Sequence, residues 1–290
     1  MKKSDARLHP RRSALFMPGS NDRALIKART LPADCIIIDL EDAVAPEEKQ
    51  LAREAAVAHL SEGGFGKRER ILRINDPSDA VGQADITAVN ALPAEALPEA
   101  ILLPKINNNG DLDSANLSKD MPLWVMIETA QAVLNCAEIA AHPQVTCLIA
   151  GTNDLAKDMQ IRSRAKREGM LYALSKMVTA ARAHRLSVLD GVFNDIHDLA
   201  GLRLECEHGL ALGFDGKTLI HPNQIETANT LFAPTSDEID EAKSIISAFE
   251  APENAGKGVI KVNGKMTELL HLGQARQLVA IAAAIQNMET

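Results

Sequence analysis

The strongest constraint on the fold of this chain is a repeated alternation of short apolar runs with longer segments of helical periodicity. Short apolar runs predict buried strands, and apolar residues spaced three or four apart predict helices that pack through one face. Strands that alternate with helices over short connections are typical of a parallel sheet with right-handed crossovers. We predict strands at Ala14–Met17, Cys35–Leu40, Arg70–Ile74, Ala100–Leu103, Leu123–Ile127, Thr146–Ala150, Ser187–Leu189 and Gly216–Ile220.

The eighth strand is the least clear, because Leu210–Phe214 could serve in place of Gly216–Ile220. Eight strand–helix units predict closure into a (β/α)8 TIM barrel, which we assign to residues 1–232. An open doubly wound sheet would favour a G-x-G-x-x-G turn after an early strand, and the sequence contains none. We predict helices between the strands at Asp22–Arg29, Pro46–Leu60, Asp79–Leu92, Ala130–Ala140, Arg164–His184 and Asn194–Gly209.

The chain beyond residue 232 exceeds what a barrel requires. We predict a C-terminal helical extension over residues 233–290 that forms an arm, a lid or a subunit contact. Its apolar helix face needs a partner surface, and a reactive site benefits from a cover that excludes water. The predicted elements are a helix at Asp237–Glu250, a Pro- and Gly-containing stretch at Pro252–Gly258, a strand at Val259–Val262, a turn at Asn263–Gly264 and a helix at Leu269–Met288.

Composition excludes several classes of function. The formal net charge is −8 and no basic stretch alternates with aromatic residues, which argues against nucleic-acid binding. No apolar run approaches the roughly 20 residues of a membrane span, and no apolar segment follows the basic N-terminus as a secretory signal would require. We therefore expect a cytoplasmic protein. The four cysteines are widely spaced, which makes a zinc site unlikely by pattern, and Cys35 and Cys147 are expected to be reduced core residues.

Polar residues concentrate just after the predicted strands, where the catalytic residues of such barrels lie. The strand starts carry no comparable set. This asymmetry is the best sign in the sequence that the chain is an enzyme. The strand-end residues are Asp39, Glu41, Asp42, Arg73, Asn75, Lys105, Glu128, Thr129, Asn153, Asp154, Asp190 and His221.

Glu128 and Asp154 follow adjacent strands, so their carboxylates can converge at one edge of the barrel. Two carboxylates with no nearby His or Cys pair favour Mg²⁺, or Mn²⁺, over zinc. The alternative is that each carboxylate pairs with a neighbouring base such as Arg73 or Lys105. On spacing alone the two interpretations remain equally open.

Arg73 is the single guanidinium among these strand ends. Its planar fork suits a substrate carboxylate or a developing enolate oxygen. The alternative is a structural ion pair with Glu41, Asp42 or Glu128. His221 follows the last strand, and a histidine there is more often a structural hydrogen-bond partner than a base.

The segment from Pro18 and Gly19 to Arg23 ends the first strand and begins a helix, so its backbone N–H groups could hold an anion. An ordinary helix N-cap explains the same residues without a ligand. Arg23 and Lys27 lie four residues apart on that helix and could meet phosphates. Such a pair is more often a solvated helix face.

Several segments together resemble the citrate lyase β-subunit-like family, within the HpcH/HpaI aldolase and malyl-CoA and citramalyl-CoA lyase superfamily. They occur in the right order and cover nearly the whole predicted barrel. The matching segments are S-A-L-F-M-P-G-S-N-D-R (13–23), I-I-I-D-L-E-D-A-V (36–44), R-I-N (73–75), L-L-P-K-I (102–106), M-I-E-T (126–129), G-T-N-D-L (151–155) and G-F-D-G-K-T-L-I-H-P-N-Q-I (213–225).

The resemblance implies a TIM barrel with Mg²⁺ on Glu128 and Asp154 and with Arg73 orienting the acid part of the substrate. It implies an acyl-CoA or acyl-carrier thioester near Arg23 and Lys27, a 2-oxo acid as the second reactant, and a homotrimer or hexamer. It also implies that a C-terminal lid covers a neighbour's active site. Family lyases carry a lid aspartate in a G-x-M-x-D-like segment.

This chain departs from that pattern, because Gly264-Lys265-Met266-Thr267-Glu268 places a glutamate where the lyases have aspartate. Glu268 is the leading lid acid/base candidate and Asp42 a weaker one. The expected activity is cleavage or formation of a C–C bond beside a thioester carbonyl. A malyl-CoA-type thioesterase, a 2-oxo acid aldolase and a subunit of a larger citrate lyase complex remain alternatives.

Overall fold

The computed structural model describes residues 9–162 and 167–289. The chain divides into two compact units, of which the first contains Arg11–Phe232 and the second contains residues 233–289 together with residues 9 and 10. Across the described part of the chain, no helix combines the length and the apolar character that crossing a membrane requires.

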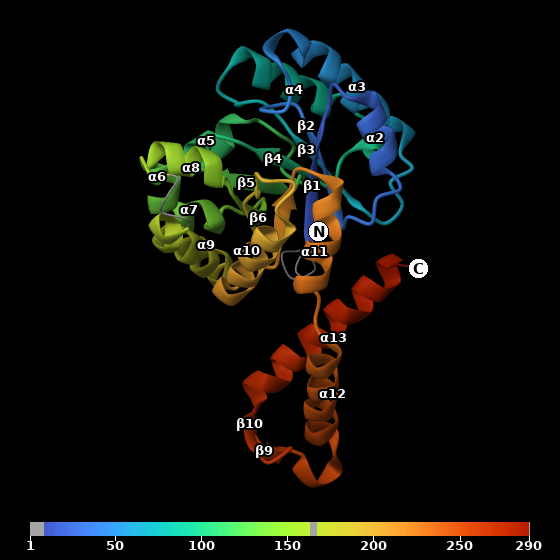
Figure 1. The fold of residues 1–290 in the computed structure, drawn as a ribbon, viewed down its shortest axis with the longest axis vertical. Helices are drawn as coiled ribbons and strands as arrows, with labels where there is room; N and C mark the ends of the chain where they lie inside the picture. The colour runs from blue at the N-terminus through green and yellow to red at the C-terminus, as the bar shows by residue number, and fades with distance from the viewer. Residues whose placement is uncertain (1–8, 163–166, 290) are drawn as a thin grey trace. The chain divides into compact units, whose positions relative to one another are not determined.

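Eight parallel strands close into a barrel in the first unit, each pairing with the next and β8 pairing with β1 (Figure 1). They are β1 (Ser13–Pro18), β2 (Cys35–Asp39), β3 (Glu69–Arg73), β4 (Ala100–Leu103), β5 (Leu123–Ile127), β6 (Val145–Ala150), β7 (Ser187–Asp190) and β8 (Gly216–Leu219). The predicted TIM barrel is confirmed, and no predicted strand end differs from the observed one by more than one residue. Leu210–Phe214 is not the eighth strand, because residues 210–212 belong to a helix.

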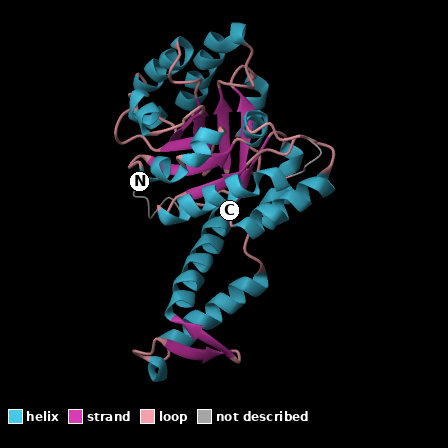
Figure 2. Cartoon of the chain, turned by 90° about the vertical axis from the view of Figure 1, so that its left-hand side faces the viewer, coloured by secondary structure: helices cyan, strands magenta, loops and turns pink. Residues whose placement is uncertain are grey.

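Helices surround the barrel (Figure 2). They are α2 (Asp22–Ala28), α3 (Lys49–Glu62), α4 (Ala80–Asn90), α5 (Asn109–Ser114), α6 (Ala130–Leu134), α7 (Cys136–Ala141), α8 (Thr152–Asp158), α9 (Leu171–Ala183), α10 (Leu199–Leu212) and α11 (Ile225–Leu231). The short helices α5, α8 and α11 were not predicted, because a helix of six or seven residues is too short to show a clear apolar periodicity in the sequence.

Four predicted helices have clearly different bounds. The one predicted at Pro46–Leu60 begins with a 3-10 turn, so α3 starts only at Lys49. Ala130–Ala140 is two helices separated at Asn135. The helix predicted from Asn194 begins only at Leu199, because Asp198 caps it by accepting a hydrogen bond from the Gly201 N–H at 2.8 Å. The helix predicted at Arg164–His184 is observed as α9, and its first three residues lie outside the described part.

The core has two layers on either side of the barrel strands. Alternate strand residues fill the barrel interior, while their neighbours pack outward under the helices. Both layers are mainly aliphatic, as the composition predicts, with Trp124 as the largest fully buried side chain. The four cysteines are free and buried, as expected for Cys35 and Cys147.

The second unit is a helix pair joined by a hairpin. Its elements are α12 (Ser236–Glu250), β9 (Val259–Val262), β10 (Lys265–Glu268) and α13 (Leu269–Glu289). The strands β9 and β10 pair antiparallel around Asn263 and Gly264, whose φ angles of 47° and 83° suit a tight turn. The strand β10 was not predicted, so Glu268 ends a strand and does not begin the last helix. The helix α13 packs on α12. This contact covers part of the apolar face of α13, for which the sequence predicted a partner surface.

Candidate active site

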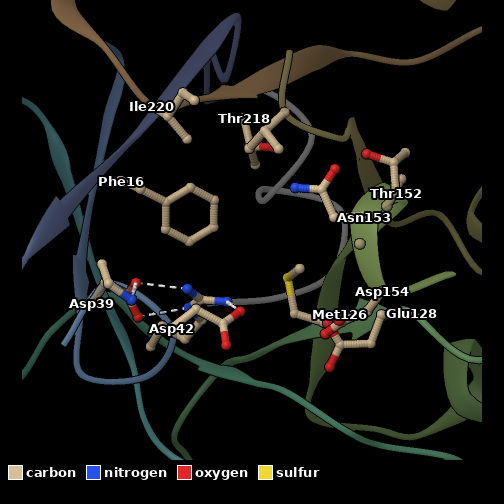
Figure 3. A pocket seen from close by; sticks show the side chains of 15 residues that line it. Phe16, Asp39, Asp42, Met126, Glu128, Thr152, Asn153, Asp154, Thr218 and Ile220 are labelled. Atoms are coloured by element: carbon tan, nitrogen blue, oxygen red, sulfur yellow. Dashed lines mark hydrogen bonds and ion pairs between the residues drawn. The ribbon is translucent and has the colours of Figure 1, made fainter. Parts of the chain in front are cut away.

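A cavity of about 260 Å³ opens at the C-terminal ends of the barrel strands. That volume suits a small organic acid and is below the range of sites that enclose larger ligands. Figure 3 shows Asp39 and Phe16 on one side of the cavity and Glu128 and Asp154 on the other. The lining residues are Phe16, Asp39, Asp42, Ala43, Arg73, Met126, Glu128, Ala150, Gly151, Thr152, Asn153, Asp154, Val192, Thr218 and Ile220.

Glu128 and Asp154 share one basic partner. The Lys105 Nζ lies 3.3 Å from Oε1 of Glu128 and also contacts Oδ2 of Asp154. Because one nitrogen atom is within ion-pair distance of both carboxylates, the two groups are close enough to surround a single cation. Lys105 therefore forms the ion pairs that the sequence offered as an alternative to a metal site. The closeness of the two carboxylates is also what a shared metal ion would need.

Local structure fixes Glu128 in place. The Lys105 backbone N–H donates to its Oε1 at 2.7 Å, and the residue is only 2% exposed. A Cβ atom on Gly151 would lie 2.4 Å from the Glu128 Cβ, so only glycine allows this approach. Burial raises the pKa of Glu128, although Lys105 opposes the shift. Positive charge beside this carboxylate thus favours its ionised form.

Arg73 faces three carboxylates. Its Nε and Nη2 each donate to Asp39 at 2.6 Å, and its Nη1 lies 2.7 Å from Glu41 and 3.3 Å from Asp42. Its guanidinium also lies over the Phe16 ring, 4.7 Å from the centroid. The structural ion pairs of Arg73 with Glu41 and Asp42, which the sequence offered as an alternative to substrate binding, are present. The edge of the guanidinium that could bind a carboxylate in a bidentate manner is occupied by Asp39. Arg73 nevertheless lines the cavity, so its charge is available to a ligand.

Glu41, one of the three carboxylates that face Arg73, was not proposed as a site residue. Burial raises its pKa to about 8, with Asp42 and Glu128 adding to the shift and Arg73 and Lys105 opposing it. Its side chain is 10% exposed, whereas that of Asp42 is 66% exposed. Asp42 is therefore the carboxylate of this loop that solvent and a ligand can reach.

The residues proposed for thioester binding lie at the end of β1 and on α2, which follows it. Pro18 ends β1, and the Gly19 N–H donates to the Asp39 carbonyl at 2.8 Å. A Cβ on Gly19 would meet Leu40 at 2.8 Å, which explains the glycine. Arg23 and Lys27 are exposed on α2. None of these four residues lines the cavity, so their assignment to thioester binding stays a prediction.

Glu268 belongs to the second unit, where it is the exposed last residue of β10. Its assignment as a lid residue also stays a prediction. His221 caps the turn before α11, since its ring accepts from the Asn223 N–H at 3.2 Å. The structure thus gives His221 the structural hydrogen bond that the sequence favoured.

Residues 12–222 match the family model described as HpcH/HpaI aldolase/citrate lyase. This match spans almost the whole barrel unit. The chain belongs to this family. The resemblance inferred from its motifs is therefore confirmed.

Relatives within the HpcH/HpaI family align over nearly all of the chain. A (3S)-malyl-CoA thioesterase of Cereibacter sphaeroides is 51% identical over 278 residues, covering 96% of each protein. The mitochondrial citramalyl-CoA lyase of Homo sapiens is 32% identical over 297 residues, covering 96% of this chain and 87% of that protein. The CitE crystal structure from Mycobacterium tuberculosis, in complex with magnesium, acetoacetate and coenzyme A, has a TM-score of 0.77 at 25% identity and covers 96% of this chain and 99% of that one.

Several cavity residues of this HpcH/HpaI family member were not proposed from the sequence. Thr152 and Asn153 precede Asp154 in the G-T-N-D segment, so their position beside a metal candidate was a usable signal. Thr218 lines the cavity from β8, whose sequence is Gly-Lys-Thr-Leu. Phe16 and Met126 gave no signal, because apolar strand residues are expected in the core.

Proposed function

We propose that this chain is a Mg²⁺-dependent enzyme that acts on a malyl-type 3-hydroxyacyl-CoA thioester, with thioester hydrolysis as its main reaction. The observation that carries the proposal is the convergence of Glu128 and Asp154 on one cation position in a cavity that Arg73 also lines. The lyases and thioesterases among the relatives support the substrate class.

The residues fit a magnesium ion. Both candidate ligands are carboxylates, the cavity lining holds no histidine or cysteine, and an ammonium already lies between the two oxygens. Magnesium in the CitE crystal structure supports the same choice, and Mn²⁺ has the same ligand preference. A bound ion would supply Lewis-acid stabilisation of negative charge on substrate oxygens.

The chain's own side chains would hold and orient the acid part of the substrate. Arg73 presents positive charge that Asp39 holds at a fixed position. Asn153 and Thr218 offer hydrogen-bonding groups, while Met126 and Ile220 make part of the wall apolar and limit water. The cavity admits the acyl end of a thioester, and the coenzyme would extend toward Arg23 and Lys27 outside it.

In hydrolysis, a water oxygen adds to the thioester carbonyl carbon, the C–S bond breaks, and the thiolate takes up a proton. Asp42 is the exposed carboxylate in the cavity lining, so it is our candidate to accept the proton from water. Glu268 from another subunit is the second candidate. The 51% identity to a (3S)-malyl-CoA thioesterase favours hydrolysis.

Cleavage of the C–C bond is the second candidate reaction, supported by the relationship to citramalyl-CoA lyase. The test is incubation with (3S)-malyl-CoA and Mg²⁺, with mass spectrometry of products and a colorimetric assay of free thiol. Hydrolysis yields malate and one free thiol for each substrate consumed. Cleavage yields glyoxylate and acetyl-CoA with no free thiol. Products of cleavage alone would overturn the thioesterase proposal, and no turnover of a panel of 3-hydroxyacyl-CoA thioesters would overturn the substrate class.

A further inference from the structure

Lys105 has an unusual backbone conformation beside the proposed metal site. Its φ of 58° lies in the left-handed region, which residues with side chains adopt rarely and at a cost. In this conformation its backbone N–H and its ammonium both face Glu128, at 2.7 Å and 3.3 Å from the same Oε1 atom. The ammonium also contacts Asp154. One residue thus joins the two carboxylates.

The two contacts of Lys105 differ in what a metal would do to them. The backbone N–H approaches Glu128 from the chain, and this bond can persist with a cation bound. The ammonium occupies the space between the two carboxylates, which is the space that a shared divalent ion would take. Positive charges only a few Å apart repel each other, and the repulsion is stronger near a protein than in bulk water. The ammonium and the ion are therefore alternatives.

We propose that Lys105 is the internal counter-cation of this site: its ammonium pairs with Glu128 and Asp154 when no divalent ion is bound, and it moves aside when the ion binds. This inference rests on the proposed function, because it assumes that the two carboxylates bind Mg²⁺. The side chain is 33% exposed, so it has room to move. Glu41 lies 3.8 Å from the ammonium and offers it another partner.

The test is direct binding of Mn²⁺ to the full-length protein by titration calorimetry, without substrate. Lys105→Met keeps the length of the side chain and removes its charge, so it should bind Mn²⁺ about tenfold more tightly than the wild type. Lys105→Arg keeps the competing charge and should stay near the wild-type affinity. Lys157→Met is the matched control, because Lys157 is an exposed lysine on the same helix as Asp154.

A thermal unfolding experiment separates this role from a merely structural one. Without divalent ions, Lys105→Met should unfold at a lower temperature than the wild type, since two close carboxylates then lack their counter-charge. Saturating Mn²⁺ should remove most of that difference. If the wild type binds Mn²⁺ and Lys105→Met binds it with equal or weaker affinity, this inference alone is overturned. Absence of Mn²⁺ binding in both proteins would overturn the metal site of the proposed function instead.

Discussion

The two ends of the barrel both carry buried charges, so the expectation that the strand starts hold no comparable polar set was wrong, but the two ends balance their charges differently. At the N-terminal end, Arg11 pairs with Glu69 and Arg12 with Asp34, each through two side-chain hydrogen bonds of 2.9 Å or less. All four residues are at most 5% exposed. The Arg11 guanidinium also lies over Trp124, 4.8 Å from the ring centroid. In the described part of the chain, each of these two arginines pairs with a buried carboxylate.

The C-terminal end has an excess of negative charge. Arg73 and Lys105 are its two basic side chains in the ion pairs described above, and they face five carboxylates: Asp39, Glu41, Asp42, Glu128 and Asp154. A closed set of buried pairs makes the fold sensitive to the loss of either partner, whereas an uncompensated set of carboxylates attracts a cation. The comparison indicates that one end is built for stability and the other for binding.

The largest expected effect is the loss of the metal ligands. Glu128→Ala and Asp154→Ala should each lower thioester turnover by about 10³-fold or more, because either change removes a ligand of the charge-stabilising ion. Glu138→Ala, an exposed glutamate on α7, is the control. Full turnover after exhaustive EDTA treatment would contradict the assignment.

At the N-terminal end of the barrel, Arg11→Met should lower the free energy of unfolding and leave the catalytic turnover unchanged. It leaves Glu69 buried without its main partner, a loss that typically costs about 3–5 kcal/mol. Urea unfolding measures the free energy, and turnover per folded molecule should stay near that of the wild type. Arg203→Met breaks a half-exposed surface pair and should cost less than about 1 kcal/mol. Equal stability of the two variants would remove the contrast between the barrel ends.

Arg73→Lys tests whether the guanidinium acts on the substrate. Lysine keeps the charge but cannot span Asp39 and the other carboxylates at once, so we expect a loss of about 10²-fold in kcat/KM. Arg53→Lys alters a similar short pair, with Asp85, away from the cavity lining. If Arg73→Lys turns over substrate at a near-normal rate, Arg73 is a structural ion-pair partner only.

The sequence predicted the barrel well, because apolar strands and their order follow directly from hydrophobic pattern. It predicted Glu128 and Asp154 at one edge for the same reason, since strand order places them side by side. It offered Lys105 as a partner of these carboxylates, but it could not predict that this one residue contacts both of them, because that depends on the positive φ of Lys105. Nor could it choose which carboxylate Arg73 would pair with, since Asp39, Glu41 and Asp42 all follow one strand.

A smaller effect would show whether the C-terminal end of the barrel is completed by another chain. If Glu268 acts in a neighbour's site, mixing Glu268→Ala subunits with Arg73→Ala subunits should restore part of the activity that both parents lack. Truncation after Phe249 should leave a folded barrel that still binds Mn²⁺ but loses turnover. No recovery, despite proven subunit exchange, would place Glu268 outside a neighbour's active site.

The smallest expected effect concerns Glu41 and the pH dependence of stability. Its pKa is raised from 4.5 to about 8 in the folded protein, mainly by burial. Between those two pH values the unfolded chain releases this proton while the folded chain retains it. The folded state therefore binds more protons, and stability falls as pH rises from about 4.5 through about 8.

Glu41→Gln removes that titration, so its stability should fall less than that of the wild type over the same pH range. We expect the two curves to diverge by about 1 kcal/mol or more in urea unfolding with EDTA present. Glu69 at the opposite end is held by a bidentate arginine, so Glu69→Gln should lower stability even where Glu41→Gln raises it. If stability depends on pH in the same way in Glu41→Gln and in the wild type, Glu41 ionises normally. The C-terminal end of the barrel would then tolerate its excess negative charge without a bound proton.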